Sequence, residues 1–248
     1  MPRNFRLIIA YDGTNYAGWQ RQENAPTVQE AIEKVLQRVL REKISLAGAS
    51  RTDAGTHALG QVAHFRTASR LSSEVLLKAL NGLLPRDIRT LKVEEVPLSF
   101  HSRYQAKEKL YRYTLVTAPQ VLPQERFFVY HYPYSLHLKA MRQGSKFLIG
   151  THDFSAFQGS DTKRKSKNNR RRITRFSILQ KNDRLIFEVS ANGFLYTMVR
   201  VIAGTLLEIG IGKRIPENIQ ELLKKRDRRL AGPTVPARGL CLVRVGYS

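Results

Sequence analysis

Residues 43–67 read KISLAGASRTDAGTHALGQVAHFRT, in which two strand-like runs (43–49 and 60–67) flank a turn of small residues. The turn carries one carboxylate, Asp53, with the guanidinium of Arg51 two residues before it. Asp, Ala and Gly in succession are typical of a turn, because Asp and Gly both favour turn geometry. Taken alone, the segment therefore predicts a structural turn between two strands, and a functional role for Asp53 needs further support.

The sequence on either side of this turn predicts a β-α-β-β-α-β unit. Alternating apolar residues predict a first strand over 5–11, and a helix follows from Thr27, which forms a capping box with Glu30. A second helix is predicted over 73–84, and another strand near 90–96. Together with the two strands around the turn, these elements complete the unit.

The second part of the chain repeats this order. Its predicted elements are a strand over 110–117, a helix near 136–149, strands over 173–180 and 184–191, a helix from Leu195 to Leu206, a short helix from Pro216 and a final strand over 239–247. Two units in tandem predict an α+β fold of two ferredoxin-like βαββαβ halves with a catalytic cleft between them. Residues 1–105 would form the half with the Asp53 turn, and residues 106–248 the half with Tyr111 and a basic loop.

Net charge is where the composition departs most from that of an ordinary globular protein. The 42 Lys and Arg residues exceed the 20 Asp and Glu residues and give a formal charge of +22 at pH 7. Such a charge favours a polyanion such as nucleic acid, although a generically basic surface is the alternative. The chain has no apolar run long enough to cross a membrane and no signal-peptide pattern, so we expect a cytoplasmic protein without a membrane partner.

Eight of the 42 Lys and Arg residues lie between residues 163 and 175, a segment without Asp or Glu. Its cations are Lys163, Arg164, Lys165, Lys167, Arg170, Arg171, Arg172 and Arg175. Like charges repel one another, so the run favours binding of phosphates over a purely solvated surface. The candidate RNA-binding residues are its first five cations, Lys163, Arg164, Lys165, Lys167 and Arg170.

Motifs for metal, nucleotide-cofactor or thiol chemistry are missing from the sequence. It has no Cys/His zinc spacing, no Walker phosphate loop and no Gly-x-Gly-x-x-Gly turn. The one cysteine, Cys241, lies in an apolar run that is typical of a buried thiol. We therefore expect no cofactor and no metal, which leaves a single carboxylate able to act as nucleophile or stabiliser at a sugar carbon.

Three further residues fit a carboxylate that acts on a nucleoside. Arg51 is the cation nearest to Asp53 in the sequence and would keep it ionised. Arg200 lies on a largely apolar helix, where a charge either pairs with an acid or extends to the surface. Tyr111 lies between cations on an alternating strand, where it could stack on a base or belong to the core.

The segment Ala47–Ala58 resembles the catalytic segment of the TruA-type tRNA pseudouridine synthases. Further motifs resemble the family in its own order, namely Tyr11-Asp12-Gly13 with Gly18-Trp19-Gln20, Asn81–Pro85, Phe100–Tyr104, Lys109–Tyr113, Gly150–Phe154, Phe194–Arg200 and Ala237–Leu240. The chain departs from the family beside Asp53, with Ser50 where Gly is usual and Thr56 where Val is usual. These departures concern the geometry of the turn and leave Asp53 in place.

The resemblance implies roles for the candidate residues. Asp53 would be the catalytic nucleophile, and Tyr111 would stack on or contact the target uracil and take part in removing its C5 proton. Arg51 would help to open the RNA and occupy the space of the flipped base, while Arg200 would pair with Asp53. The implied reaction is isomerisation of uridine to pseudouridine at positions 38, 39 and 40 in the anticodon arm of tRNA, by a homodimer that flips the base out of its stack.

Two other functions stay open from the sequence. A non-catalytic basic RNA-binding module would explain the charge, although it would not explain an acid placed within it. A synthase acting at another RNA position would keep the chemistry and change the target. The sequence also leaves open whether Asp53 attacks the sugar C1′ or the uracil C6 first.

Overall fold

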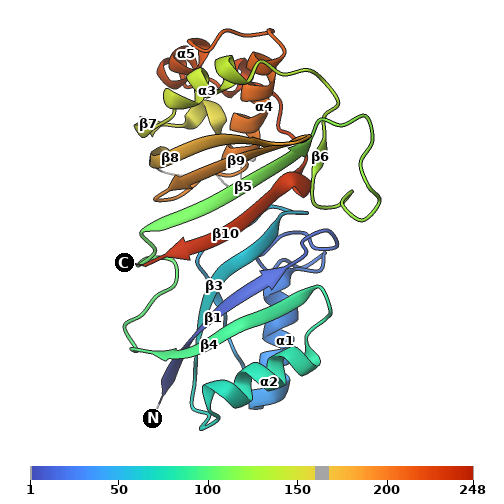
Figure 1. Cartoon of the computed structure of the whole chain (residues 1–248). Coiled ribbons are helices and arrows are strands. Elements are labelled where there is room, and N and C mark those ends of the chain that lie inside the picture. The colour runs from blue at the N-terminus through green and yellow to red at the C-terminus, as the bar shows by residue number, and fades with distance from the viewer. Residues whose placement is uncertain (1, 160–167, 248) are drawn as a thin grey trace. The chain divides into compact units, whose positions relative to one another are not determined.

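The computed structural model describes residues 2–159 and 168–247, which contain ten strands and five α-helices (Figure 1). The mixed helix and strand content is the one that the sequence predicts. The chain divides into two units, the first made of Met1–Lys107 with Cys241–Ser248, and the second of Glu108–Leu240. The sequence assigns the last strand to the second half of the chain, but its contacts from Cys241 onward place it in the first unit.

The first unit is built on antiparallel strands in the order β4-β1-β3. Their bounds are β1 (Arg3–Tyr11), β3 (His57–Thr67) and β4 (Ile88–Val96). Two more strands pair with β3, namely β2 (Ala47–Gly48), antiparallel to it, and β10 (Leu240–Gly246), parallel to it. In the parallel pair, Cys241 lies opposite His57, so the end of the chain reaches the start of β3.

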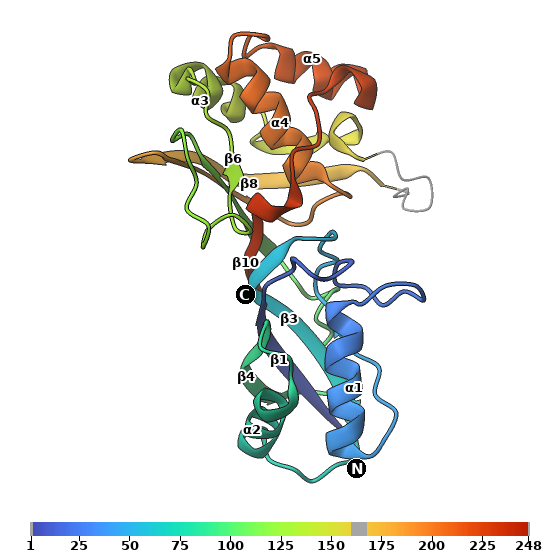
Figure 2. The same cartoon turned by 90° about the vertical axis from the view of Figure 1, so that its right-hand side faces the viewer.

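Two helices of the first unit, α1 (Val28–Leu40) and α2 (Ser73–Leu83), pack on the same face of its strands (Figures 1 and 2). The hydroxyl of Thr27 accepts a hydrogen bond from the N–H of Glu30, as the predicted N-cap requires. The core consists of fully buried apolar side chains, with Ile32 and Leu36 on α1 and Leu76 on α2. Burial of these helix faces against the sheet stabilises the unit.

The second unit has antiparallel strands in the order β5-β9-β8-β7. They are β5 (Glu108–Val116), β9 (Arg184–Ala191), β8 (Arg170–Lys181) and β7 (Gly150–Asp153), with β6 (Tyr130–His131) paired to β5. The helices α3 (Leu138–Lys146), α4 (Met198–Gly210) and α5 (Asn218–Lys225) lie on one side of these strands (Figure 2). Helix α4 is buried along almost its whole length, which accounts for its apolar sequence.

Some of the predicted elements differ from the observed ones. The strand predicted over 43–49 is wrong except at Ala47–Gly48. The N–H of Leu46 donates to the carboxylate of Glu33 on α1 (2.9 Å), and its carbonyl accepts from Gln29 on the same helix (3.0 Å). Side chains of α1 thus take the backbone groups that a neighbouring strand would need. Strand β3 begins at His57, three residues before the predicted start, and the short strands β6 and β7 were not expected.

Candidate active site

The Asp53 turn joins β2 to β3 in the first unit. The N–H of Thr56 donates to the carbonyl of Asp53 (3.1 Å), and Gly55 adopts a φ of +74°. The side chain of Asp53 is half-buried, whereas Arg51 is exposed. The predicted turn is confirmed, and it presents a carboxylate that is neither sealed in the core nor fully solvated.

A second loop of the first unit, residues 12–19, holds this turn in place through hydrogen bonds. The N–H of Trp19 donates to the carbonyl of Thr52 (3.2 Å), and the N–H of Gly55 donates to the carbonyl of Tyr16 (3.2 Å). The hydroxyl of Thr52 shares a hydrogen bond with that of Tyr11 (2.8 Å). Two motifs that lie more than thirty residues apart in the sequence therefore meet around Asp53, and the turn is held by fixed neighbours.

The two loops approach each other so closely that glycine is required at the contacts. A Cβ on Gly18 would lie 2.6 Å from the carbonyl oxygen of Thr52, and Gly18 has a φ of +96°. A Cβ on Gly13 would lie 2.1 Å from the carbonyl oxygen of Thr56. These supporting contacts were not predicted from the sequence, and the signal for them is the pair of glycines that flank Tyr16 within eight residues.

Substitution of Gly18 by Ala is expected to destabilise the protein well beyond the effect of a left-handed backbone alone. The left-handed conformation costs about 1–2 kcal/mol for a residue with a Cβ, and forced contact with the Thr52 backbone adds about 1–3 kcal/mol. Gly212 provides a matched control, because its φ is +77° and no atom lies within 4 Å of its Cβ position. Thermal melts should show a clearly larger fall in Tm for Gly18→Ala than for Gly212→Ala, and equal falls would contradict the clash.

The two ends of the turn are held in place at His57 and at Ser50. The ring Nδ1 of buried His57 accepts a hydrogen bond from the N–H of Gly13 (3.1 Å) and lies 3.1 Å from a carboxylate oxygen of Asp12. At the other end, the side-chain amide of Gln61 accepts a hydrogen bond from the N–H of Ser50 (3.2 Å) and donates one to the carbonyl of Ser50 (2.8 Å). The turn closes with Ser50 and Thr56 in place, so the two departures from the family pattern do not prevent its formation.

The hydroxyl of Thr56 is buried and, within the residues that the structure describes, has no hydrogen-bond partner. An unsatisfied buried hydroxyl destabilises a protein by about 1–3 kcal/mol, so Thr56→Val, which keeps the shape, is expected to raise Tm. Thr52→Val is the matched control, because it removes a hydroxyl that is bonded to Tyr11 and should lower Tm. The two variants should shift Tm in opposite directions, and shifts of the same sign would argue against this account.

Tyr111 lies on β5 in the second unit, where only 5% of its side chain is exposed. Its ring meets that of Phe194 edge to face, with centroids 5.0 Å apart. Tyr113 follows on the same face of the strand, and its hydroxyl donates to the carbonyl of Pro236 (2.9 Å). Two further motifs of the family pattern, around Tyr111 and around Phe194, are therefore in contact.

Arg200 lies in the first turn of α4, also in the second unit. Its Nε–H donates to the carbonyl of Val235 (2.8 Å), which holds the guanidinium against the protein rather than extended into solvent. The side chain is partly buried. Just before the helix, Thr197 adopts a φ of +53°, so the chain turns sharply into α4. A fixed cation at this point can stabilise an anion that comes close to it.

The structure places the predicted site residues as follows. Asp53 and Arg51 belong to the first unit, and Tyr111 and Arg200 belong to the second. Of the predicted RNA-binding cations, Arg170 is exposed at the start of β8. The other four, Lys163, Arg164, Lys165 and Lys167, lie outside the described residues.

Within residues 2–159 and 168–247, no cluster of three His, Cys, Asp or Glu side chains could hold a metal ion. In the same ranges, no helix combines the length and the apolar character needed to span a membrane.

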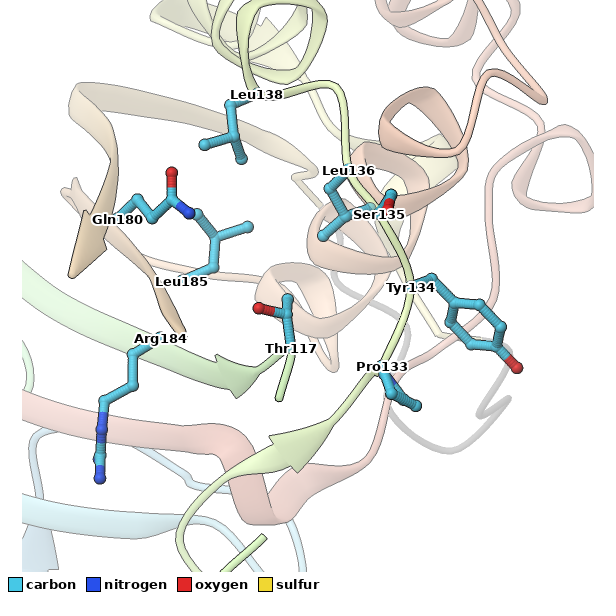
Figure 3. Close-up of a pocket in the computed structure, with 9 residues that line it drawn as sticks. All are labelled: Thr117, Pro133, Tyr134, Ser135, Leu136, Leu138, Gln180, Arg184 and Leu185. Carbon is cyan, nitrogen blue, oxygen red and sulfur yellow. The ribbon is translucent and has the colours of Figure 1, made fainter. Parts of the chain in front are cut away.

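A pocket in the second unit is lined by none of the predicted site residues. It has a volume of about 400 Å³ and is lined by Thr117, Pro133, Tyr134, Ser135, Leu136, Leu138, Gln180, Arg184 and Leu185 (Figure 3). Arg184 forms an ion pair with Glu125, and the ring of Tyr134 points away from Leu185. Neither Tyr111 nor Arg200 lines this pocket, so it is not the candidate active site.

Comparison with known proteins identifies the class to which this fold and site belong. The family described as tRNA pseudouridine synthase matches residues 7–105 and 145–248, which include Asp53 and Arg200. The chain belongs to the tRNA pseudouridine synthase family, whose members are isomerases.

Individual relatives refine this classification. The chain is 46% identical to tRNA pseudouridine synthase A 2 of Clostridium tetani over the full length of both proteins. It is 47% identical to tRNA pseudouridine synthase A of Acetivibrio thermocellus and 44% identical to that of Clostridium acetobutylicum, in each case over 99% of this chain and 100% of the relative. Among solved structures, an archaeal box H/ACA sRNP Nop10-Cbf5 complex is similar at a TM-score of 0.34 and 11% identity, over 82% of this chain and 44% of that one.

Proposed function

We propose that this chain converts uridine to pseudouridine at positions 38, 39 and 40 in the anticodon arm of tRNA, with Asp53 as the nucleophile. The observation that carries the proposal is the Asp53 turn itself. A half-buried carboxylate stands in the segment that resembles the family's catalytic motif, and backbone hydrogen bonds from a second loop hold it in place. The chain around this acid has a net charge of +22, which suits an RNA substrate.

The reaction is an isomerisation and needs no external reactant. The bond between uracil N1 and the sugar C1′ breaks, the base turns, and a bond forms between C5 and C1′. The hydrogen of C5 leaves as a proton, and N1 gains one. The carboxylate of Asp53 supplies the electron pair for a covalent intermediate and recovers it when the new glycosidic bond is complete.

The other site residues take the roles that the family resemblance suggests. Tyr111 contacts the uracil and assists removal of the C5 proton, and Arg200 stabilises the carboxylate of Asp53. Arg51 occupies the space that the target base leaves when it flips out of the RNA stack. The exposure of Arg51 and the fixed orientation of Arg200 toward Val235 are compatible with these roles.

Recognition of tRNA completes the proposal. The basic segment from Lys163 to Arg170 binds backbone phosphates, and the enzyme acts in the cytoplasm as a homodimer without a cofactor. We also propose that both units are ferredoxin-like. The first unit supports this description, because its elements follow the order β-α-β-β-α-β and its strands the order β4-β1-β3, with β2 beside β3.

An assay with purified protein and an unmodified tRNA transcript tests the function directly. Pseudouridine is mapped along the RNA after reaction without added metal or cofactor, and modification confined to positions 38–40 is the expected result. Pseudouridine at another position would show a synthase with a different target. Tight tRNA binding without any pseudouridine would instead favour the non-catalytic RNA-binding module.

A further inference from the structure

The segment between β4 and β5, residues 97–107, displays an exposed aromatic stack in the first unit. The side chain of Tyr104 is 77% exposed, and its ring centroid lies 4.2 Å from that of His101 at an interplanar angle of 33°. The ring of His101 lies in turn 4.6 Å from the buried ring of His64 on β3. We call the pair of outer rings the His101–Tyr104 stack.

The base of this stack is fixed by hydrogen bonds to three strands. The N–H of Ser102 donates to Nδ1 of His64 (3.2 Å), and its hydroxyl donates to the carbonyl of Ala47 on β2 (2.6 Å). The carbonyl of Ser102 accepts from the hydroxyl of Tyr247, just after β10 (2.7 Å). On the other side, the side-chain amide of Asn4 on β1 donates to the carbonyl of Phe100 (3.1 Å).

The ring of His101 is oriented by its own turn. Its Nδ1 accepts hydrogen bonds from the N–H groups of Arg103 (3.2 Å) and Tyr104 (3.4 Å). The pKa of His64 beneath it is lowered to about 4, first by burial and then by His101, so this inner ring is uncharged at neutral pH. The stack therefore rests on a neutral, rigid support, and little conformational entropy is lost when a flat partner binds to it.

The charge around the stack suits a polyanion. Residues 97–107 contain two cations, Arg103 and Lys107, and no Asp or Glu. Both cations are exposed. Among the described residues, neither the guanidinium of Arg103 nor the hydroxyl of Tyr104 has a hydrogen-bond or ion-pair partner. A flat aromatic surface beside unpaired cations is the combination that binds an unstacked base together with its phosphates.

The stack is also distant from the Asp53 turn along the same strand. His64 follows His57, the first residue of β3 after the turn, by seven positions, which corresponds to roughly 20 Å of extended chain. A base that contacts the stack is therefore not the base that reaches Asp53.

We propose that the His101–Tyr104 stack binds an unpaired base of the RNA substrate outside the target position, with Arg103 and Lys107 holding the neighbouring phosphates. The proposal rests on the proposed function only in that RNA is the substrate. The stack contributes to substrate affinity, because it lies too far from the Asp53 turn to touch the reacting uridine.

Binding and turnover measured separately test this assignment. Tyr104→Ala is expected to raise the Kd for tRNA about 5- to 100-fold, because stacking of one base contributes that range of affinity. The single-turnover rate at saturating tRNA should stay within about 2-fold of the wild-type rate. Tyr104→Phe should retain wild-type affinity, since the ring and not the hydroxyl makes the contact.

Two further variants sharpen the test. Tyr134→Ala removes a tyrosine that is 61% exposed in the second unit and should leave the Kd unchanged. The slope of log Kd against log salt concentration measures the number of phosphate contacts. Arg103→Gln should reduce this slope by about one phosphate contact, whereas Tyr104→Ala should leave it unchanged.

Several results would overturn the proposal. One is an unchanged Kd for Tyr104→Ala, and another is an equal loss of affinity in Tyr134→Ala. A change in oligomeric state by sedimentation, without loss of RNA affinity, would show that Tyr104 contacts a second protein chain instead. Because the binding arm needs no pseudouridine product, failure of the proposed reaction and failure of the stack give distinguishable results.

Discussion

Replacement of Asp53 by Asn is expected to reduce pseudouridine formation at least about 10⁴-fold, because the amide cannot supply the electron pair for the covalent intermediate. The Kd for tRNA should stay within about 3-fold of the wild-type value, since removal of one negative charge does not weaken binding to a polyanion. The turn should also keep its shape, because backbone hydrogen bonds join residues 16, 19, 52, 53, 55 and 56. Release of tritium from tRNA labelled at uracil C5 measures the rate.

The matched control for this variant is Glu95→Gln. It makes the same change in net charge at an exposed carboxylate that pairs with Arg3 on the sheet (2.6 Å). This control should retain the wild-type rate. Asp53→Ala, which cannot revert by deamidation, should be as inactive as Asp53→Asn. Measurable turnover by Asp53→Ala at more than about one hundredth of the wild-type rate would remove Asp53 from the role of nucleophile.

The local elements of this fold were accessible from the sequence because their signals are local. The helix that begins after Thr27 carries both a cap and an apolar stripe, and the structure has it at Val28–Leu40. Strand β9 was predicted with its observed bounds, since apolar alternation defines it fully. The pairing of Cys241 with His57 was inaccessible, because a parallel contact between residues so far apart leaves no periodic trace in the sequence.

The candidate site, too, could be predicted from the sequence only in part. Asp53 could be identified from its motif, and the turn around it from Asp and Gly. The groups that hold the turn could not be identified, because they are backbone carbonyls of Tyr16 and Thr52 and the side chain of Gln61, whose role depends on tertiary contact. The aromatic stack at Tyr104 could not be predicted from the sequence for a related reason, since exposure of an aromatic ring cannot be inferred from residue type.

Tyr111→Phe is expected to have the second largest effect, a fall of about 10²- to 10⁴-fold in the rate of pseudouridine formation at saturating tRNA. The phenyl ring fills the same space against Phe194, so the packing and the proposed contact with the uracil are retained. What is lost is the hydroxyl to which we assign assistance in transfer of the C5 proton. The Kd for tRNA should therefore change by less than about 3-fold, and the deficit should appear in kcat.

Tyr113→Phe separates this chemical role from a structural one. Tyr113 lies two residues further along β5, is fully buried, and loses a hydrogen bond to the carbonyl of Pro236 when its hydroxyl is removed. Loss of that bond should lower the free energy of unfolding by about 1 kcal/mol and leave kcat near the wild-type value. If Tyr111→Phe lowers Tm as Tyr113→Phe does and keeps its kcat, Tyr111 is a core residue. A fall in kcat without any C5–H isotope effect in the variant would instead show that its hydroxyl acts at a step other than proton removal.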